Sequence, residues 1–184
     1  MAMQSLTLLN DQQVQLALRR LARTLVENHD RFEQTVLLGL QPRGIHFCER
    51  LAAEIRSIID APLHVGKLDI TFHRDDFRRH EEPLKASPTE IDFLIEGKKV
   101  ILVDDVLYTG RTVRAAMDAM LSYGRPENVE LCVFIDRRFS RHLPVQADYV
   151  GRQVDSLQSE KVSVKWQATD GKDEVVLFTS KGSI

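Results

Sequence analysis

Apolar positions along the chain follow helical and strand periodicities in alternation. Asn10 and Gln13 form the pattern of a helix start with a capping-box partner. One apolar face then repeats at helical spacing through Val14, Ala17, Leu18, Leu21 and Leu25. A second helical repeat comprises Ile45, Cys48, Ala52, Ile55 and Ile59. A third helix is predicted over residues 111–122, where Gly124 and Pro126 would end it.

Short apolar runs between these helices predict buried strands over residues 36–40, 100–103 and 129–135. Leu68, Ile70 and Phe72 alternate with polar residues, as in a half-exposed strand. The segment from Tyr149 onward is typical of several short strands. Strands that alternate with helices predict an α/β fold, with a mostly parallel twisted sheet flanked by helices.

The 184 residues fit one domain, residues 1–184, because the sequence contains no repeats, no low-complexity segments and no obvious linker. Residues 74–88 are rich in charge and proline, so we expect a flexible excursion there.

Composition narrows the function classes. The chain is 43% hydrophobic and 28% charged, as in soluble globular proteins, and its net charge of −2 indicates no nucleic-acid partner by itself. There is no secretory signal and no run of 18 apolar residues, so we expect a cytoplasmic protein without a membrane segment. Cys48 and Cys132 have apolar neighbours and are expected to be buried free thiols.

The most informative stretch joins a buried strand to a helix. It consists of Val100, Ile101, Leu102, Val103, Asp104, Asp105, Val106, Leu107, Tyr108, Thr109, Gly110, Arg111 and Thr112. Ligands of open α/β sheets bind at the carboxyl ends of the strands. Residues 109–112 would offer unpaired helix-start N–H groups, two hydroxyls and the positive end of a helix dipole, which suits a phosphate monoester. Gly110 would let the backbone approach the anion.

Asp104 and Asp105 accept hydrogen bonds and suit a vicinal diol or a hydrated Mg²⁺. A ligand that has both a diol and a phosphate is a ribose 5-phosphate. The alternative is that the segment is only a capped helix beside a surface pair of aspartates.

Other phosphate and metal motifs are missing from the sequence. It has no nucleoside-triphosphate P-loop, no Gly-x-Gly-x-x-Gly, no His-Glu-x-x-His and no Cys-x-x-Cys.

Residues 100–112 resemble the phosphoribosyl-pyrophosphate (PRPP) motif of type I phosphoribosyltransferases. Further stretches resemble the PyrR family, whose members are bifunctional: each is both a regulator of the pyrimidine operon and a uracil phosphoribosyltransferase. They are residues 39–45, 66–76, 113–119, 124–126, 143–144, 147–151 and 159–162, and the likeness covers about residues 9–168.

The resemblance implies a type I phosphoribosyltransferase fold with a small hood and a flexible β-arm at about residues 69–90. It also implies formation of UMP and pyrophosphate from uracil and PRPP, with Mg²⁺ held mainly by pyrophosphate. All thirteen motif residues would form the PRPP site. Asp104, Asp105 and Arg74 would be the catalytic residues, and the two aspartates would also orient the metal. Arg43 and Gly44 would bind pyrophosphate, Gly44 through an unusual backbone conformation, and Arg74 would close over it.

Both arginines also have a non-functional interpretation. Arg43 could be an exposed residue of a turn, and Arg74 could be a solvated charge on an exposed loop. The resemblance places uracil recognition at Ile135, Asp136 and Arg137, largely through backbone groups. Backbone recognition leaves little sequence trace, so a phosphoribosyltransferase for another nucleobase is the alternative.

A second hypothesis is an RNA-binding attenuation regulator that recognises the leader RNA of a pyrimidine operon. Its candidate contacts are Arg19, Arg20, Arg23, Arg141 and Arg152, which could instead be ordinary solvated charges. RNA-binding relatives usually carry a Gly-His-Arg turn where this chain has the longer segment 138–142, and Gln146 stands where an arginine is common. The resemblance also implies a homodimer or a higher homo-oligomer.

Overall fold

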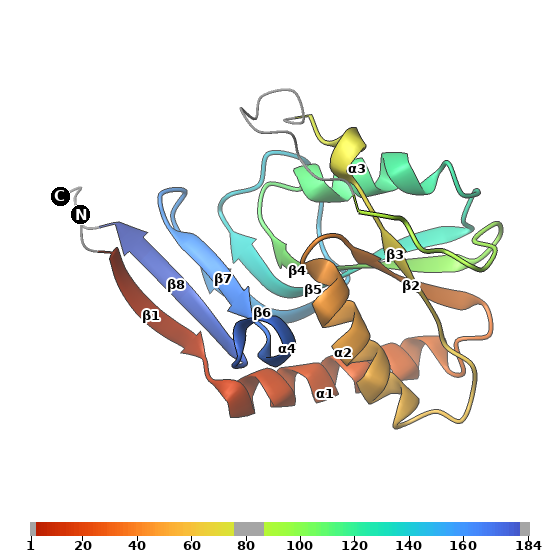
Figure 1. The fold of residues 1–184 in the computed structure, drawn as a ribbon, viewed down its shortest axis with the longest axis horizontal. Coiled ribbons are helices and arrows are strands. Elements are labelled where there is room, and N and C mark those ends of the chain that lie inside the picture. Colours follow the sequence, from red (N-terminus) through yellow and green to blue (C-terminus); the bar gives the residue numbers. More distant parts are fainter. Residues whose placement is uncertain (1–2, 76–86, 181–184) are drawn as a thin grey trace.

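The computed structural model describes residues 3–75 and 87–180 of the chain. Two sheets and their helices form the molecule (Figure 1). In chain order the elements are β1 (Met3–Leu9), α1 (Asp11–His29), β2 (Thr35–Leu40), α2 (Gly44–Arg56), β3 (His64–Leu68), η1 (Thr71–His73), β4 (Lys99–Leu107), α3 (Arg111–Met120), β5 (Asn128–Arg138), β6 (Tyr149–Asp155), β7 (Lys161–Lys165), α4 (Gln167–Asp170) and β8 (Glu174–Ser180).

The larger sheet has five parallel strands in the order β3-β2-β4-β5-β6, as the alternating pattern predicts. Its central strand β4 sends Ile101 and Val103 into the core that α1 and α2 cover, and Val100 and Leu102 into the core that α3 covers. Helices therefore lie on both faces of the sheet (Figure 1). Burial on both faces explains why β4 begins as an uninterrupted apolar run.

A smaller antiparallel sheet, β1-β8-β7, forms the hood. The sequence did not predict β1, because among the described strands it pairs with β8, which comes from the opposite end of the chain. Trp166, at the end of the hood, stacks on Phe47 of α2 with ring centroids 5.9 Å apart and also contacts Phe134 of β5. These rings join the hood to the main core.

The local expectations mostly agree with the fold. The capping box of Asn10 and Gln13 starts α1, and both cysteines are buried free thiols. The expected strand through Phe72 is wrong, because β3 ends at Leu68 and residues 71–73 form a 3₁₀ turn. The Asp69 carboxylate accepts hydrogen bonds from the Thr71 amide at 3.0 Å and hydroxyl at 2.6 Å, and this local turn ends the strand.

The two ends of the expected arm lie side by side. Lys67 and Glu90 exchange backbone hydrogen bonds of 2.8 and 2.9 Å, and Asp69 accepts one from the Ser87 amide at 3.0 Å. Residues 76–86, in the middle of this arm, lie outside the described residues.

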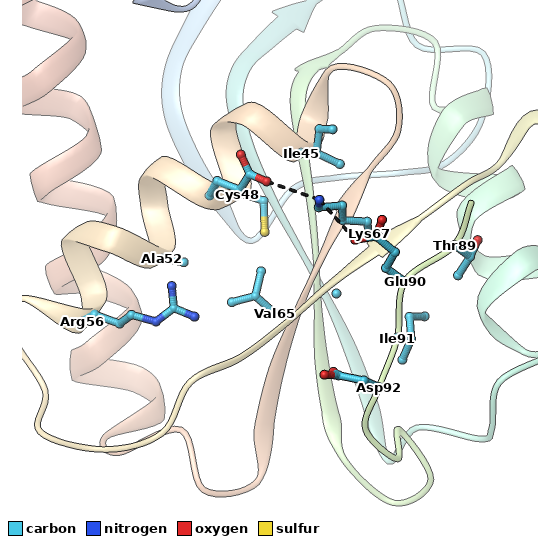
Figure 2. A pocket seen from close by; sticks show the side chains of 12 residues that line it. Ile45, Cys48, Ala52, Arg56, Val65, Lys67, Thr89, Glu90, Ile91 and Asp92 are labelled. Carbon is cyan, nitrogen blue, oxygen red and sulfur yellow. Dashed lines mark ion pairs between the residues drawn. The ribbon is translucent and has the colours of Figure 1, made fainter. Parts of the chain in front are cut away.

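A cavity of about 580 Å³ lies where α2, β3 and residues 89–92 meet (Figure 2). Lys67 crosses one side of it and forms ion pairs with Glu49 at 3.7 Å and Glu90 at 3.2 Å. These ion pairs join α2 to the returning end of the arm. Among the described residues, every helix is too short or too polar to cross a membrane.

Candidate functional site

The turn between β4 and α3 has the conformation that its glycine predicts. Gly110 precedes the helix with φ of 90°, in the left-handed region that favours glycine. The Thr109 carbonyl accepts hydrogen bonds from the amides of His142 at 3.0 Å and Leu143 at 3.2 Å. The turn is therefore held from one side by the segment that follows β5.

A pocket of about 210 Å³ opens at this turn. It is lined by Arg74, Asp75, Asp104, Val106, Leu107, Tyr108, Thr109, Gly110, Arg111 and Thr112. One cavity is therefore bordered by three features that the sequence predicted. They are the carboxylate of Asp104, the turn before α3 and Arg74 of the arm. Asp75, which the sequence did not single out, forms an ion pair with Arg111 across the pocket.

Asp104 and Asp105 are both buried but face different neighbours. Asp104 lines the pocket, and its Oδ1 accepts a hydrogen bond of 2.9 Å from the Asp105 amide. Burial, together with the neighbouring Asp105 charge, raises the pKa of Asp104 well above its ordinary value. Burial also raises the pKa of Asp105, although the guanidinium of Arg43 opposes this shift. Two such carboxylates favour a cation or hydroxyl donors beside them.

Arg43 connects the loop before α2 to Asp105 and to the hood. Its Nε lies 3.4 Å from Oδ2 of Asp105, and its Nη2 donates to the Val164 carbonyl and to Asp170 Oδ2 at 3.1 Å. The side chain remains 44% exposed, so the guanidinium can still reach an anion. The hood contacts were not foreseen, because Val164 and Asp170 are more than 120 positions away in sequence.

Gly44 is needed for space and not for an unusual backbone, which corrects the sequence expectation. It begins α2 and lies outside the left-handed region. A Cβ atom at this position would lie 2.7 Å from the Val103 carbonyl and 2.9 Å from Asp104 Oδ1. The glycine thus allows the loop to approach β4 directly at the acidic pair.

The first four motif residues, which the sequence places in the PRPP site, do not line the pocket. Val100, Ile101, Leu102 and Val103 are fully buried in the two cores. They position the strand, and the residues that follow border the pocket.

The end of β5 lies beside the motif. The Ile135 side chain is in the core, and Asp136 and Arg137 are buried. The Arg137 guanidinium lies 4.0 Å from the centre of the Tyr108 ring and donates to Ser156 Oγ at 2.8 Å. Burial lowers the pKa of Arg137, and the ring face stabilises the cation.

The five candidate RNA contacts separate into two places. Arg19, Arg20, Arg23 and Arg152 line a groove of about 740 Å³ between α1 and β6. Arg141 is not part of this groove. Its guanidinium donates to the Tyr108 carbonyl and to Asp136, beside the pocket.

The described residues contain no group of three or more His, Cys, Asp or Glu side chains that could hold a metal. The carboxylates nearest the pocket are those of Asp75 and Asp104, which line it, and that of Asp105 beside Asp104.

Comparison with known proteins agrees with this architecture. Residues 4–169 match the phosphoribosyl transferase domain family. The bifunctional protein PyrR of Bacillus mycoides is 46% identical over 174 residues, covering 92% of this chain and 95% of its own length. That of Desulfosudis oleivorans is 45% identical over 171 residues, covering 93% of this chain and 94% of its own.

A hypoxanthine phosphoribosyltransferase from Staphylococcus aureus has a similar fold, with a TM-score of 0.71 at 17% identity over 96% of this chain and 93% of its own. At this identity the likeness concerns the fold alone. The sequence matches go further: the chain belongs to the phosphoribosyl transferase domain family and, within it, to the PyrR family.

Proposed function

We propose that this phosphoribosyltransferase makes UMP and pyrophosphate from uracil and PRPP with the help of Mg²⁺. The observation that carries the proposal is that Arg74, Asp104 and residues 109–112 border the same pocket. It combines an arginine, a buried carboxylate and a helix-start turn, which match the pyrophosphate, the hydroxyls and the 5-phosphate of the sugar donor.

In this proposal the two ends of PRPP occupy different parts of the site. The amides and hydroxyls of residues 109–112 bind the 5-phosphate, and Asp104 accepts hydrogen bonds from the ribose hydroxyls. Arg43 and the loop before Gly44 face the pyrophosphate, because Arg43 lies on the Asp105 side of the acidic pair. Bound Mg²⁺ would neutralise charge on the pyrophosphate, and Asp104 and Asp105 would orient it.

The reaction forms a bond between a uracil nitrogen and the anomeric carbon while the bond from that carbon to pyrophosphate breaks. The uracil nitrogen gives up its proton to solvent or to the departing pyrophosphate. The residues contribute by positioning both reactants and by stabilising negative charge on the departing pyrophosphate. Arg74, at the base of the arm, would close over the pyrophosphate and exclude water.

The nucleobase follows from membership in the PyrR family, because the buried backbone at residues 135–137 carries no side-chain signature for uracil. A steady-state comparison of uracil, hypoxanthine, guanine and orotate tests this part. Uracil should have the highest kcat/KM. A higher value for either purine or for orotate would contradict the uracil assignment.

A second proposed function is binding of the leader RNA of the pyrimidine operon. It is supported by the groove in which Arg19, Arg20, Arg23 and Arg152 meet. Arg20 donates to the Val150 and Gly151 carbonyls. Arg19 lies 3.9 Å from Glu54 but its side chain is 63% exposed, so Arg19 and Arg23 are the better phosphate contacts.

A gel-shift titration of that RNA with and without UMP tests the regulatory role. The double variant Arg19→Gln/Arg23→Gln should lower affinity and reduce the dependence on salt by about two phosphate contacts. The matched control is Arg31→Gln/Arg125→Gln, which changes two exposed arginines outside the groove. Equal affinity of the two double variants, or an absence of specific binding by the wild type, would contradict this role.

A further inference from the structure

The loop after β5 turns sharply inward. Phe139 has φ of 66°, a left-handed conformation that is rare for a bulky residue. Its ring is 81% exposed, so burial of the aromatic side chain does not explain the conformation. The next residue, Ser140, is only 2% exposed. A strained backbone at such a point is typical of a segment held in place for a functional reason.

The turn brings Arg141 between the ends of two neighbouring strands. Its Nη1 donates to the carbonyl of Tyr108, just after β4, and its Nη2 forms an ion pair with Asp136 on β5. The side chains of Arg141 and Asp136 are 24% and 10% exposed, so solvent screens this pair only partly. One planar guanidinium thus fixes both strand ends, which the single ammonium of lysine would do less well.

The next two residues of the same loop hold the adjacent peptide. The amides of His142 and Leu143 both donate to the Thr109 carbonyl. The loop therefore holds the carbonyls of Tyr108 and Thr109, the two residues immediately before Gly110. In a planar trans peptide the N–H points opposite to the carbonyl. Holding these two carbonyls directs the Thr109 and Gly110 N–H groups away from the loop.

We propose that Arg141 is a positioning residue for the 5-phosphate of PRPP and UMP. It fixes the Tyr108 carbonyl, and with it the orientation of the amide donors in the turn at Gly110. This role rests on the proposed function of the pocket. Arg141 does not line the pocket, so it acts through the backbone.

The experiment is isothermal titration of the full-length protein with three ligands in the presence of Mg²⁺: PRPP, UMP and inorganic pyrophosphate. PRPP and UMP share the 5-phosphate, and pyrophosphate lacks it. Arg141→Met should weaken PRPP and UMP about tenfold, a typical effect of losing a charge-assisted hydrogen bond. Pyrophosphate binding should stay within about twofold of the wild type, because Arg43 and Gly44 lie on the other loop.

Two further variants complete the test. Arg141→Lys keeps the charge and should lose about threefold in PRPP affinity, because an ammonium cannot reproduce the planar fork. Arg138→Met is the matched control, at the end of β5 just before this loop. Arg138 pairs with Asp155, whose side chain is 58% exposed, and its loss should leave all three affinities unchanged.

Several results would overturn the inference. One is wild-type affinity of a folded Arg141→Met for PRPP and UMP. Another is an equal loss for all three ligands, which would indicate general damage to the fold. If Arg141→Met does not fold, wild-type affinities in Arg141→Lys would be decisive against the role. Failure of the wild type to bind PRPP and UMP would instead contradict the proposed function on which this inference rests.

Discussion

The Nε atom of Arg43 lies 3.4 Å from Oδ2 of Asp105, and the same guanidinium donates to Asp170 in the short helix α4 of the hood at 3.1 Å. One side chain thus connects the loop before α2, the acidic end of β4 and the hood. The carboxylates hold Arg43 beside the position proposed for pyrophosphate. Its exposed fraction leaves it able to change partner when an anion arrives.

Replacing Arg43 by methionine should raise the KM for PRPP about tenfold, because one charge-assisted contact to pyrophosphate is lost. Steady-state kinetics with PRPP as the varied substrate measure the effect. Arg31→Met, on an exposed residue outside the pocket, is the matched control. A KM equal to that of the control would contradict the proposed role of Arg43.

Asp104→Asn should stabilise the fold at neutral and alkaline pH while it impairs turnover. The pKa of Asp104 is raised in the folded state, so its contribution to stability is present in acid and is lost as pH rises through that pKa. The melting temperature of the variant at pH 8 should exceed that of the wild type by several degrees, since ~1 kcal/mol corresponds to about 2–4 °C at this size.

The difference between Asp104→Asn and the wild type should shrink as pH falls below the raised pKa of Asp104, because the folded wild-type carboxyl then takes up a proton. Asp60→Asn, at an exposed position, should stay within about 2 °C of the wild type at every pH. A melting temperature for Asp104→Asn below that of the wild type at pH 8 would refute this account of the buried pair.

Much of the fold and of this site could be predicted from local patterns. The apolar run into Asp104, the glycine before α3 and the capping box at Asn10 are local in sequence, and each appears as expected. Local sequence determines such features because they depend on backbone conformation and on neighbouring hydrogen bonds.

Contacts between distant segments could not be predicted in the same way. Strand β1 depends on β8, and Arg43 depends on Asp170. Arg141 was predicted to contact RNA because its charge is visible in the sequence. The inward turn at Phe139 that directs it to Tyr108 is visible only in the fold.

Gly44→Ala should lower kcat/KM by about 100-fold, because the new methyl group would meet the Val103 carbonyl at 2.7 Å and push the loop away from Asp104. The control is Gly97→Ala. Gly97 has φ of 68°, so alanine is strained there, but no atom lies within 4 Å of its added Cβ. It should lose stability and keep normal kcat/KM. Near-normal kinetics of a folded Gly44→Ala would contradict the close approach of the loop and β4.

Removal of divalent cations should abolish turnover, and added Mg²⁺ should restore it. Phosphates of the substrate need charge neutralisation that the two carboxylates cannot supply. Turnover assays after chelation, followed by titration with Mg²⁺, measure this dependence. Full activity in excess chelator would exclude the metal from the proposed mechanism.

The most direct measurement of the central claim is a product assay with PRPP, Mg²⁺ and uracil. The protein should form UMP and pyrophosphate in equal amounts, and Asp104→Asn/Asp105→Asn should lower the rate by on the order of 100-fold or more. Wild-type protein that forms neither product, or a double variant that keeps the normal rate, would contradict the assignment of this pocket as the phosphoribosyl transfer site.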